Sequence, residues 1–208
     1  GLLVAAAVVG ALLAAEWLLF RQAPDQALLS LGFGRPAPHG TLAALGVCAA
    51  MLAVIPIYAA IYGASFMSYP GWLWLLPGLF AQAGIAEEAL FRGYVFGRLR
   101  RGRSFWHAAA LATAPFVMMH LTLFATMAWP VALAAVLLSV ILSFPLARLF
   151  ELGGNTIWAP ALLHFTVQGV IKVVELPGDT GLPVVWMAAS AAIPYLVLLS
   201  WRPSSVPH

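Results

Sequence analysis

The stretch Gly84–Gly93 reads GIAEEALFRG and places two adjacent carboxylates and an arginine inside an otherwise apolar run. A charged side chain at the centre of a bilayer costs about 3 kcal/mol on insertion scales, so such residues usually face a polar interior and mark function. On a helix, Glu88 and Arg92 lie one turn apart on one face, whereas Glu87 lies about 100° round from Glu88. One carboxylate can therefore pair with the arginine while the other points into a cavity. The simpler interpretation is a structural ion pair that holds two helices together.

The composition around this stretch is that of a membrane protein. Of the 208 residues, 63% are hydrophobic and only 8% are charged, and the mean hydropathy is +0.96. A soluble domain carries about 25% charged residues, so the sequence predicts an all-α, polytopic helical bundle that forms one transmembrane domain over residues 1–208. The net charge of +3 does not indicate a nucleic-acid partner, because most basic residues fall in loops at one membrane face. The single cysteine, Cys48, excludes an intramolecular disulfide.

Windows of about 20 apolar residues predict seven membrane spans. Glycine and proline mark several of the joints between them. The approximate ranges are 2–20, 41–63, 72–99, 104–124, 128–150, 156–174 and 183–201.

The arginines predict how these spans are oriented. Four of them cluster between the third and fourth spans, at Arg98, Arg100, Arg101 and Arg103. If every span crosses the membrane, the same side also contains Arg21, Arg35, Arg148 and Arg202. The opposite loops contain no lysine or arginine, although Lys172 lies near the far end of the sixth span. We therefore expect loop 98–103 and the C-terminus in the cytoplasm and loop 176–182 outside, in the inner (plasma) membrane of a bacterium.

Further polar residues lie within the later spans. Phe116 precedes His120 by four residues and His164 precedes Gln168 by four, so each pair occupies one helix face. A single histidine in an apolar helix is more often a hydrogen-bonded packing residue than a catalyst. In a nearly uncharged bundle, however, these groups and the Glu pair are the main partners available to one another. We expect Glu87, His120 and His164 to converge on one polar cavity.

Such a cluster can hydrolyse a peptide bond in more than one way. A carboxylate in a site poor in water is a suitable general base, and a neighbouring histidine can share the water or protonate a leaving amine. A second histidine and an amide can donate hydrogen bonds to a tetrahedral oxyanion. The same Glu, His and His could instead hold zinc with an open position for water. The motifs of zincins and serine hydrolases are absent, and Cys48 lies outside the cluster.

These residues resemble a known family. Glu87-Glu88-x-x-x-Arg92, Phe116-x-x-x-His120 and His164-x-x-x-Gln168 are similar to the motifs of the CPBP family, the CAAX proteases and bacteriocin-processing enzymes also called Abi proteins. That family resembles type II CAAX prenyl endopeptidases in its membrane core. The resemblance covers residues 72–174. The sequence departs from the family at Gln168, where an asparagine or aspartate is usual, and the extra methylene shifts the amide by about a bond length.

The resemblance implies a role for each motif residue. Glu87 would activate water, His120 would orient that water, and His164 with Gln168 would stabilise the oxyanion. Glu88 and Arg92 would form the pair that fixes the third span. Members of the family are often labelled metalloproteases, with Glu87, His120 and His164 as the candidate zinc ligands here, but a metal-free glutamate mechanism is also proposed. We favour the metal-free mechanism, because two histidines, one glutamate and a competing amide are not a decisive ligand set.

We therefore predict an intramembrane endopeptidase that cleaves a membrane-associated or lipid-anchored protein or peptide. Its expected partners are that substrate and the lipid bilayer, without nucleic acid. The alternative is a non-proteolytic immunity or scaffold protein on the same fold. A small-solute transporter is a weaker rival, because the sequence has no internal repeat. We interpret Glu16 and Lys172 as interfacial or snorkelling residues outside the site.

Overall fold

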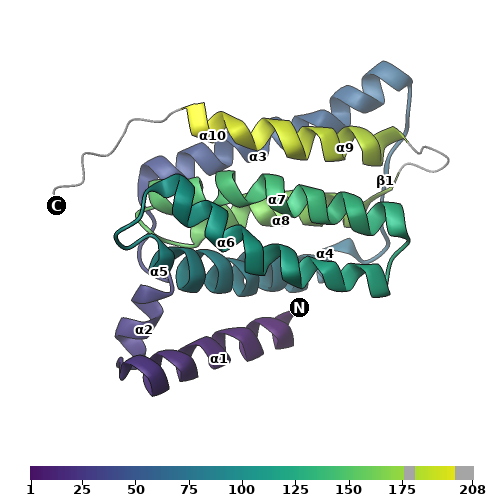
Figure 1. Cartoon of the computed structure of the whole chain (residues 1–208). Helices are drawn as coiled ribbons and strands as arrows, with labels where there is room; N and C mark the ends of the chain where they lie inside the picture. The colour runs from purple at the N-terminus through teal and green to yellow at the C-terminus, as the bar shows by residue number, and fades with distance from the viewer. Residues whose placement is uncertain (176–180, 200–208) are drawn as a thin grey trace.

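The fold is built almost wholly from helices, as expected for a chain whose backbone must satisfy its own hydrogen bonds in lipid. The computed structural model describes residues 1–175 and 181–199 (Figure 1). Within these residues, five helices are long and apolar enough to cross a membrane. They are α1 (Leu2–Phe20), α3 (Pro38–Tyr62), the stretch Phe105–Ala125, α7 (Trp129–Leu152) and the stretch Gly181–Leu199.

Two of these stretches contain a change of helix type. The stretch that starts at Phe105 consists of α6 (Phe105–His120) and the 3-10 helix η3 (Leu121–Ala125). The final stretch consists of α9 (Gly181–Ala192), the 3-10 helix η4 (Ile193–Tyr195) and α10 (Leu196–Leu199). Of the predicted loop 176–182, only residues 181 and 182 are described, and Arg202 lies outside the described residues.

The other two predicted spans carry most of the polar motif, and the first of them is less regular. Residues 72–99 form α4 (Trp72–Leu79), two π-helical segments, η1 (Phe80–Ala86) and η2 (Ala89–Phe96), and the short α5 (Gly97–Leu99). The sixth span is α8 (Trp158–Val173), with 16 residues. A π-helical turn changes the direction in which the following side chains point and is frequent at functional sites. The polytopic, all-α prediction is confirmed, and the π-helical segments lie on either side of Glu87 and Glu88.

Short elements between the spans were not predicted. Helix α2 (Pro24–Ser30) follows α1, with a proline at its start where no amide hydrogen bond is lost. Strand β1 (Met67–Ser68) pairs antiparallel with β2 (Val174–Glu175). Two residues per strand are too few for an alternating pattern to be visible in the sequence.

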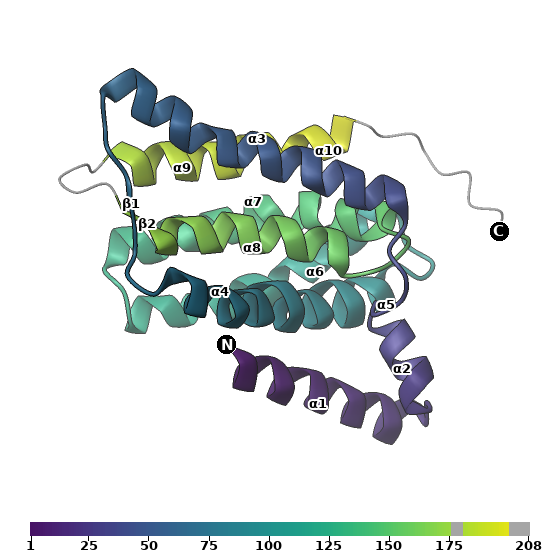
Figure 2. The same ribbon diagram turned by 180° about the vertical axis from the view of Figure 1, so that it is seen from behind.

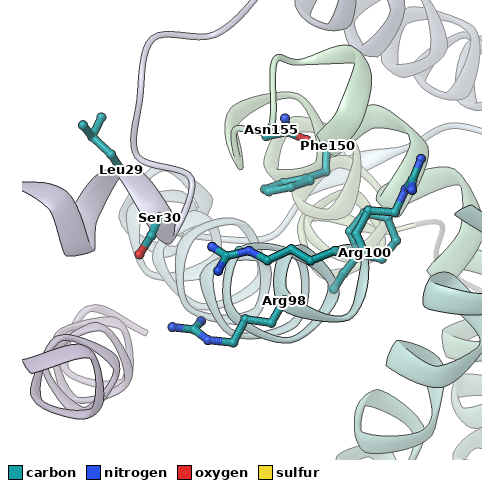
Figure 3. Close-up of a pocket in the computed structure, with 10 residues that line it drawn as sticks. Leu29, Ser30, Arg98, Arg100, Phe150 and Asn155 are labelled. Atoms are coloured by element: carbon teal, nitrogen blue, oxygen red, sulfur yellow. The ribbon is translucent and has the colours of Figure 1, made fainter. Parts of the chain in front are cut away.

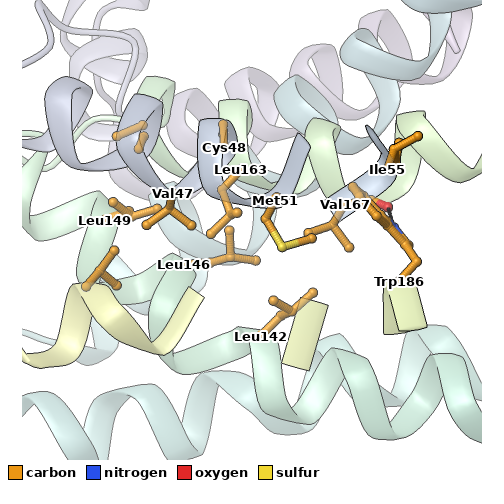
Figure 4. Packing of buried hydrophobic residues seen from close by; sticks show 13 residues of the cluster. Val47, Cys48, Met51, Ile55, Leu142, Leu146, Leu149, Leu163, Val167 and Trp186 are labelled. Carbon is orange, nitrogen blue, oxygen red and sulfur yellow. Dashed lines mark hydrogen bonds between the residues drawn. The ribbon is translucent and has the colours of Figure 1, made fainter. Parts of the chain in front are cut away.

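Helix α8 occupies the centre of the bundle. It packs against α3, η1 and α7, and Figure 2 shows it between α3 and α4. Its apolar side chains pack with buried ones from α3, α7, α9 and α10, and the cluster includes Met51, Leu146, Leu163 and Trp186 (Figure 4). The indole of Trp186 also donates a hydrogen bond of 3.0 Å to the carbonyl of Val167. In lipid this close packing, rather than exclusion of water, drives helix association, so the polar face of α8 is held in register by its apolar faces.

The last glycine of the motif has a packing role. A Cβ atom on Gly93 would lie 2.1 Å from the carbonyl oxygen of Leu31, just after α2. Only glycine lets the two backbones approach this closely. Gly93 therefore lets the α2 region pack directly against the helical stretch 72–99, which we call the motif helix.

One end of the bundle collects the charged loops. Arg98 forms an ion pair with Glu16, and Arg100 lies 2.6 Å from a carboxylate oxygen of Glu151. Arg148 lies 3.5 Å from the other oxygen of Glu151. The interpretation of Glu16 as a snorkelling residue is wrong, because its side chain is fully buried against Arg98. An arginine from another helix supplies the partner that a snorkelling carboxylate would have sought in water.

Candidate active site

The two motif carboxylates lie at the junction between η1 and η2. Both are buried: the side chain of Glu87 is 11% exposed and that of Glu88 is fully enclosed. Burying charges in this way is costly unless each has a partner. The surroundings of the two residues differ, as their separation around the helix predicts.

Glu88 has two partners that share one oxygen. Its Oε1 atom accepts a hydrogen bond of 3.1 Å from Nη1 of Arg92, which confirms the predicted pair. The same atom lies 2.6 Å from Nδ1 of His164 on α8. The guanidinium of Arg92 also stacks 4.5 Å from the centre of the Phe116 ring on α6. Glu88 and Arg92 therefore tie the motif helix to both α6 and α8.

His164 is the centre of a row of polar side chains. Because Glu88 is an acceptor, Nδ1 of His164 carries the proton of that hydrogen bond, and Nε2 of a neutral ring is left as an acceptor. The amide nitrogen of Gln168 lies 2.9 Å from Nε2 and donates to it. The ammonium of Lys172 lies 3.5 Å from the amide oxygen of Gln168. Lys172 thus extends the polar row, rather than standing apart from the site as we expected.

Glu87 faces the same imidazole from the other side. Its Oε2 atom lies 3.7 Å from Nε2 of His164, a distance too long for a hydrogen bond. Oε2 is buried and accepts no hydrogen bond from the described residues. Oε2 of Glu88 is likewise buried without a partner among the described residues, but Glu88 is fully enclosed and already bonded through Oε1. The Glu87 side chain is 11% exposed, so Glu87 is the carboxylate that a water molecule can reach.

His120 joins the site without bonding to it directly. Its Nδ1 atom donates a hydrogen bond of 2.8 Å to the carbonyl of Phe116, so Nε2 of the neutral ring is an acceptor. The Phe116 ring lies against both histidines, with centroid distances of 4.6 Å to His120 and 6.0 Å to His164. The charges of Glu87 and His164 both act on the His120 ring. Glu87 and His164 therefore approach each other directly, as predicted, whereas the Phe116 ring links His120 to His164.

The three candidate zinc ligands, Glu87, His120 and His164, are not arranged as a catalytic zinc site in the described residues. Catalytic zinc takes three protein ligands at about 2.0–2.2 Å and an open position. Residues 1–175 and 181–199 contain no group of three His, Cys, Asp or Glu side chains that could hold a metal ion. His164 also uses Nδ1 for Glu88 and Nε2 for Gln168. The donor set in this conformation therefore does not fit a zinc site of that kind.

Sequence reasoning missed the contact between Glu88 and His164. The two residues are 76 positions apart, so no spacing rule relates them. A chemical signal was nevertheless present. A buried carboxylate has about four acceptor positions, and one arginine does not use them all, while a buried histidine needs an acceptor for its N–H.

A comparison with protein families matches residues 68–170 to the family described as Type II CAAX prenyl endopeptidase Rce1-like. The matched segment starts in β1 and ends in α8, and it contains the whole row from Glu87 to Gln168. Comparisons with curated proteins and with solved structures gave no significant match.

Proposed function

We propose that this chain, which belongs to the Type II CAAX prenyl endopeptidase Rce1-like family through residues 68–170, is an intramembrane endopeptidase in which Glu87 activates water. The family itself indicates a protease embedded in the membrane and acting on a protein substrate. The single observation that carries the mechanism is the position of Glu87 Oε2, which is buried, without a hydrogen-bond partner among the described residues, and 3.7 Å from Nε2 of His164.

In the first step, Glu87 acts on a water molecule held between its Oε2 atom and the site histidines. Oε2 takes one proton from the water, and the water oxygen forms a bond to the carbonyl carbon of the scissile peptide. Nε2 of His120 is an acceptor, because Nδ1 is bonded to the Phe116 carbonyl. It therefore accepts the second water proton in a hydrogen bond and directs a lone pair toward the substrate.

The oxyanion that forms needs a donor, and the amide of Gln168 supplies one. This amide uses one N–H for Nε2 of His164 and has a second for the oxyanion. Glu88 accepts the Nδ1 proton of His164 and so fixes the ring and the tautomer whose Nε2 holds that amide, as the carboxylate orients the imidazole in a Ser-His-Asp triad. Glu88 is therefore a positioning residue as well as the partner of Arg92.

In the second step the peptide bond breaks. The tetrahedral intermediate collapses, the bond between carbon and nitrogen is cleaved, and Glu87 returns its proton to the leaving amine. The second water proton passes from the new carboxyl group to the amine, so the products are a carboxylate and an ammonium group, and Glu87 is again ionised. No step passes through a metal ion.

The substrate is a membrane-associated or lipid-anchored protein or peptide. The helices around the site expose large apolar side chains, such as Leu45, Ile61 and Met118, which face lipid in a membrane. A substrate that reaches the buried site is therefore delivered from the bilayer or its surface. We place the arginine-rich end at the cytoplasmic face of a bacterial inner membrane, because of the positive-inside rule.

The test uses the purified chain in proteoliposomes with a mixture of membrane-anchored peptides, prenylated and unprenylated, in water enriched in heavy oxygen. Mass spectrometry identifies any cleaved peptide and the heavy oxygen in its new carboxylate. We expect Glu87→Gln to abolish this incorporation. The matched control is Glu151→Gln, since the Glu151 side chain is 15% exposed, close to that of Glu87, but lies outside the site. A folded Glu87→Gln variant that cleaves as fast as the wild type would contradict the mechanism and favour the scaffold alternative.

A further inference from the structure

A second polar feature of the structure is a cavity of about 360 Å³ at the arginine-rich end. It is bounded by α2, the end of the motif helix and the connection between α7 and α8. Figure 3 shows Leu29 and Ser30 on one wall, Phe150 and Asn155 on another, and arginines from the motif helix between them. The volume is within the usual range for small-ligand sites, about 300–1,000 Å³. The candidate active-site residues do not line this cavity.

The arginines of the cavity outnumber the carboxylates beside them. Arg98, Arg100 and Arg101 line the cavity. Glu16 pairs with Arg98, and Glu151 pairs with Arg100. The side chain of Arg101 has no ion-pair or hydrogen-bond partner within residues 1–175 and 181–199. The cavity therefore has a positive charge that no protein carboxylate balances.

The pairing also holds the arginines in place. Arg98 is fixed by Glu16 and by two aromatic rings, with its guanidinium 4.5 Å from the centre of Phe20 and 3.9 Å from that of Tyr94. Arg100 is held by Glu151 through Nε and donates to the carbonyl of Arg103 through Nη1, which leaves Nη2 for another acceptor. Donors that are already ordered lose less side-chain entropy when they bind a ligand.

The remaining walls are suited to an amphipathic molecule. Phe96 and Phe150 are buried and form apolar surface inside the cavity, while Ser30 and Asn155 are polar. The cavity lies at the end of the bundle that carries the arginine-rich loop and its ion pairs. In a membrane protein such a charged end is at the headgroup level. Basic pockets at this level bind the head groups of anionic lipids.

We infer that this cavity binds a phosphate-bearing anion, supplied by the phosphodiester head group of an anionic phospholipid or by free phosphate. Guanidinium groups match phosphate oxygens with paired hydrogen bonds, and Arg101 is the donor left for this purpose. The amide of Asn155 donates to the remaining oxygens, and the phenylalanine rings cover the apolar part of a bound lipid.

The test uses the full chain purified in a neutral detergent at about 0.15 M salt, so that charges distant from the cavity are screened. Phosphatidylglycerol, phosphatidylcholine with the same acyl chains, and inorganic phosphate are added separately. Native mass spectrometry counts bound lipid, and thermal melting measures stabilisation. We expect one phosphatidylglycerol per chain with a raised melting temperature, and little binding of phosphatidylcholine. If inorganic phosphate alone raises the melting temperature and displaces phosphatidylglycerol, free phosphate is the source and the site is supported.

Matched variants distinguish lipid binding in the cavity from lipid binding to the basic surface in general. Arg101→Gln should weaken phosphatidylglycerol binding at least about fivefold, since each basic residue near a lipid surface contributes on that scale. Arg103→Gln removes the same charge two residues away, outside the cavity lining, and should change binding less than twofold. Asn155→Asp adds a carboxylate to the lining at an exposed position with φ of 59°, which aspartate tolerates. It should weaken binding at least as much as Arg101→Gln.

Two results would overturn the inference. The first is equal binding of phosphatidylglycerol and phosphatidylcholine, with no response to phosphate. The second is an equal loss of binding in Arg101→Gln and Arg103→Gln. The melting temperatures of the lipid-free variants serve as the control for folding, and we expect them to match the wild type because both arginines are exposed.

Discussion

The motif helix carries two clusters of ion pairs that differ in the sign of their excess charge. In its middle, Glu87 and Glu88 share one arginine, Arg92, and the group is sealed inside the bundle. At its end, Arg98 and its neighbours outnumber Glu16 and Glu151 and line an open cavity. Both clusters use the same pairing chemistry. The group without an ion-pair partner determines the chemistry of each cluster. Glu87, a buried carboxylate, can take a proton, whereas Arg101, an exposed arginine, can bind an anion.

The largest effect that would test this comparison is on catalysis in the sealed cluster. Glu87→Gln removes the spare carboxylate and should lower the cleavage rate by at least about a hundredfold, the lower range for a general base. It should not lower the melting temperature, because it also removes a buried charge that has no cation of its own. The measurement is the initial rate in proteoliposomes beside a melting curve. A rate loss accompanied by unfolding would mean that Glu87 is structural.

The next effect concerns the arginines of the two clusters. Arg92→Leu leaves Glu88 buried without its cation and should cost about 3–5 kcal/mol of unfolding free energy. Arg100→Leu removes an arginine whose side chain is 28% exposed, and it should cost about 1 kcal/mol or less. Both values come from unfolding titrations in mixed micelles. Equal costs would show that the two clusters do not differ in burial as the structure indicates.

A third test concerns Gly93, which lies between the two clusters on the motif helix. Gly93→Ala places a methyl group 2.1 Å from the Leu31 carbonyl, so the α2 region must move and stability should fall by about 1–3 kcal/mol. Gly97→Ala, one turn further on, meets its nearest atom at 3.4 Å and should be close to neutral. Melting temperatures of the two variants compare them directly. A neutral Gly93→Ala would mean that α2 is not held against the motif helix.

The smallest expected effect is within the polar row. Gln168→Asn withdraws the amide from His164, to which it lies 2.9 Å away. The lost hydrogen bond corresponds to about 0.5–1.5 kcal/mol, so the cleavage rate should fall by about twofold to tenfold. Steady-state kinetics on one substrate measure this change. A rate that rises in Gln168→Asn would indicate that the longer side chain is not adapted to this site.

The sequence predicted the parts of the fold that depend on one segment at a time. Apolar length identified α1, α3 and α7, because the free energy of placing a helix in lipid is a sum over its own residues. The pair between Glu88 and Arg92 also followed from spacing, since residues four apart on a helix are neighbours wherever the helix lies. Both predictions agree with the structure.

Contacts between segments were harder to predict. Glu16 was interpreted as an interfacial or snorkelling residue, but its partner is Arg98, 82 residues away, and its side chain does not reach water. His164 was expected to act beside Gln168, but its direct bond to Glu88 was not foreseen. In each case the result depends on how far a helix is rotated about its axis, which apolar length does not determine.

By itself, then, the sequence determined that the chain is a membrane bundle and which polar residues are available for chemistry, because composition and helical spacing are local properties. Only the tertiary structure decided that Glu88 bonds to both Arg92 and His164 while Glu87, partly exposed, faces Nε2 of His164. It also decided that Glu16 and Glu151 leave Arg101 without a carboxylate partner among the described residues. These assignments depend on side chains from different helices meeting at hydrogen-bond distance, and packing of the apolar faces determines which of them meet.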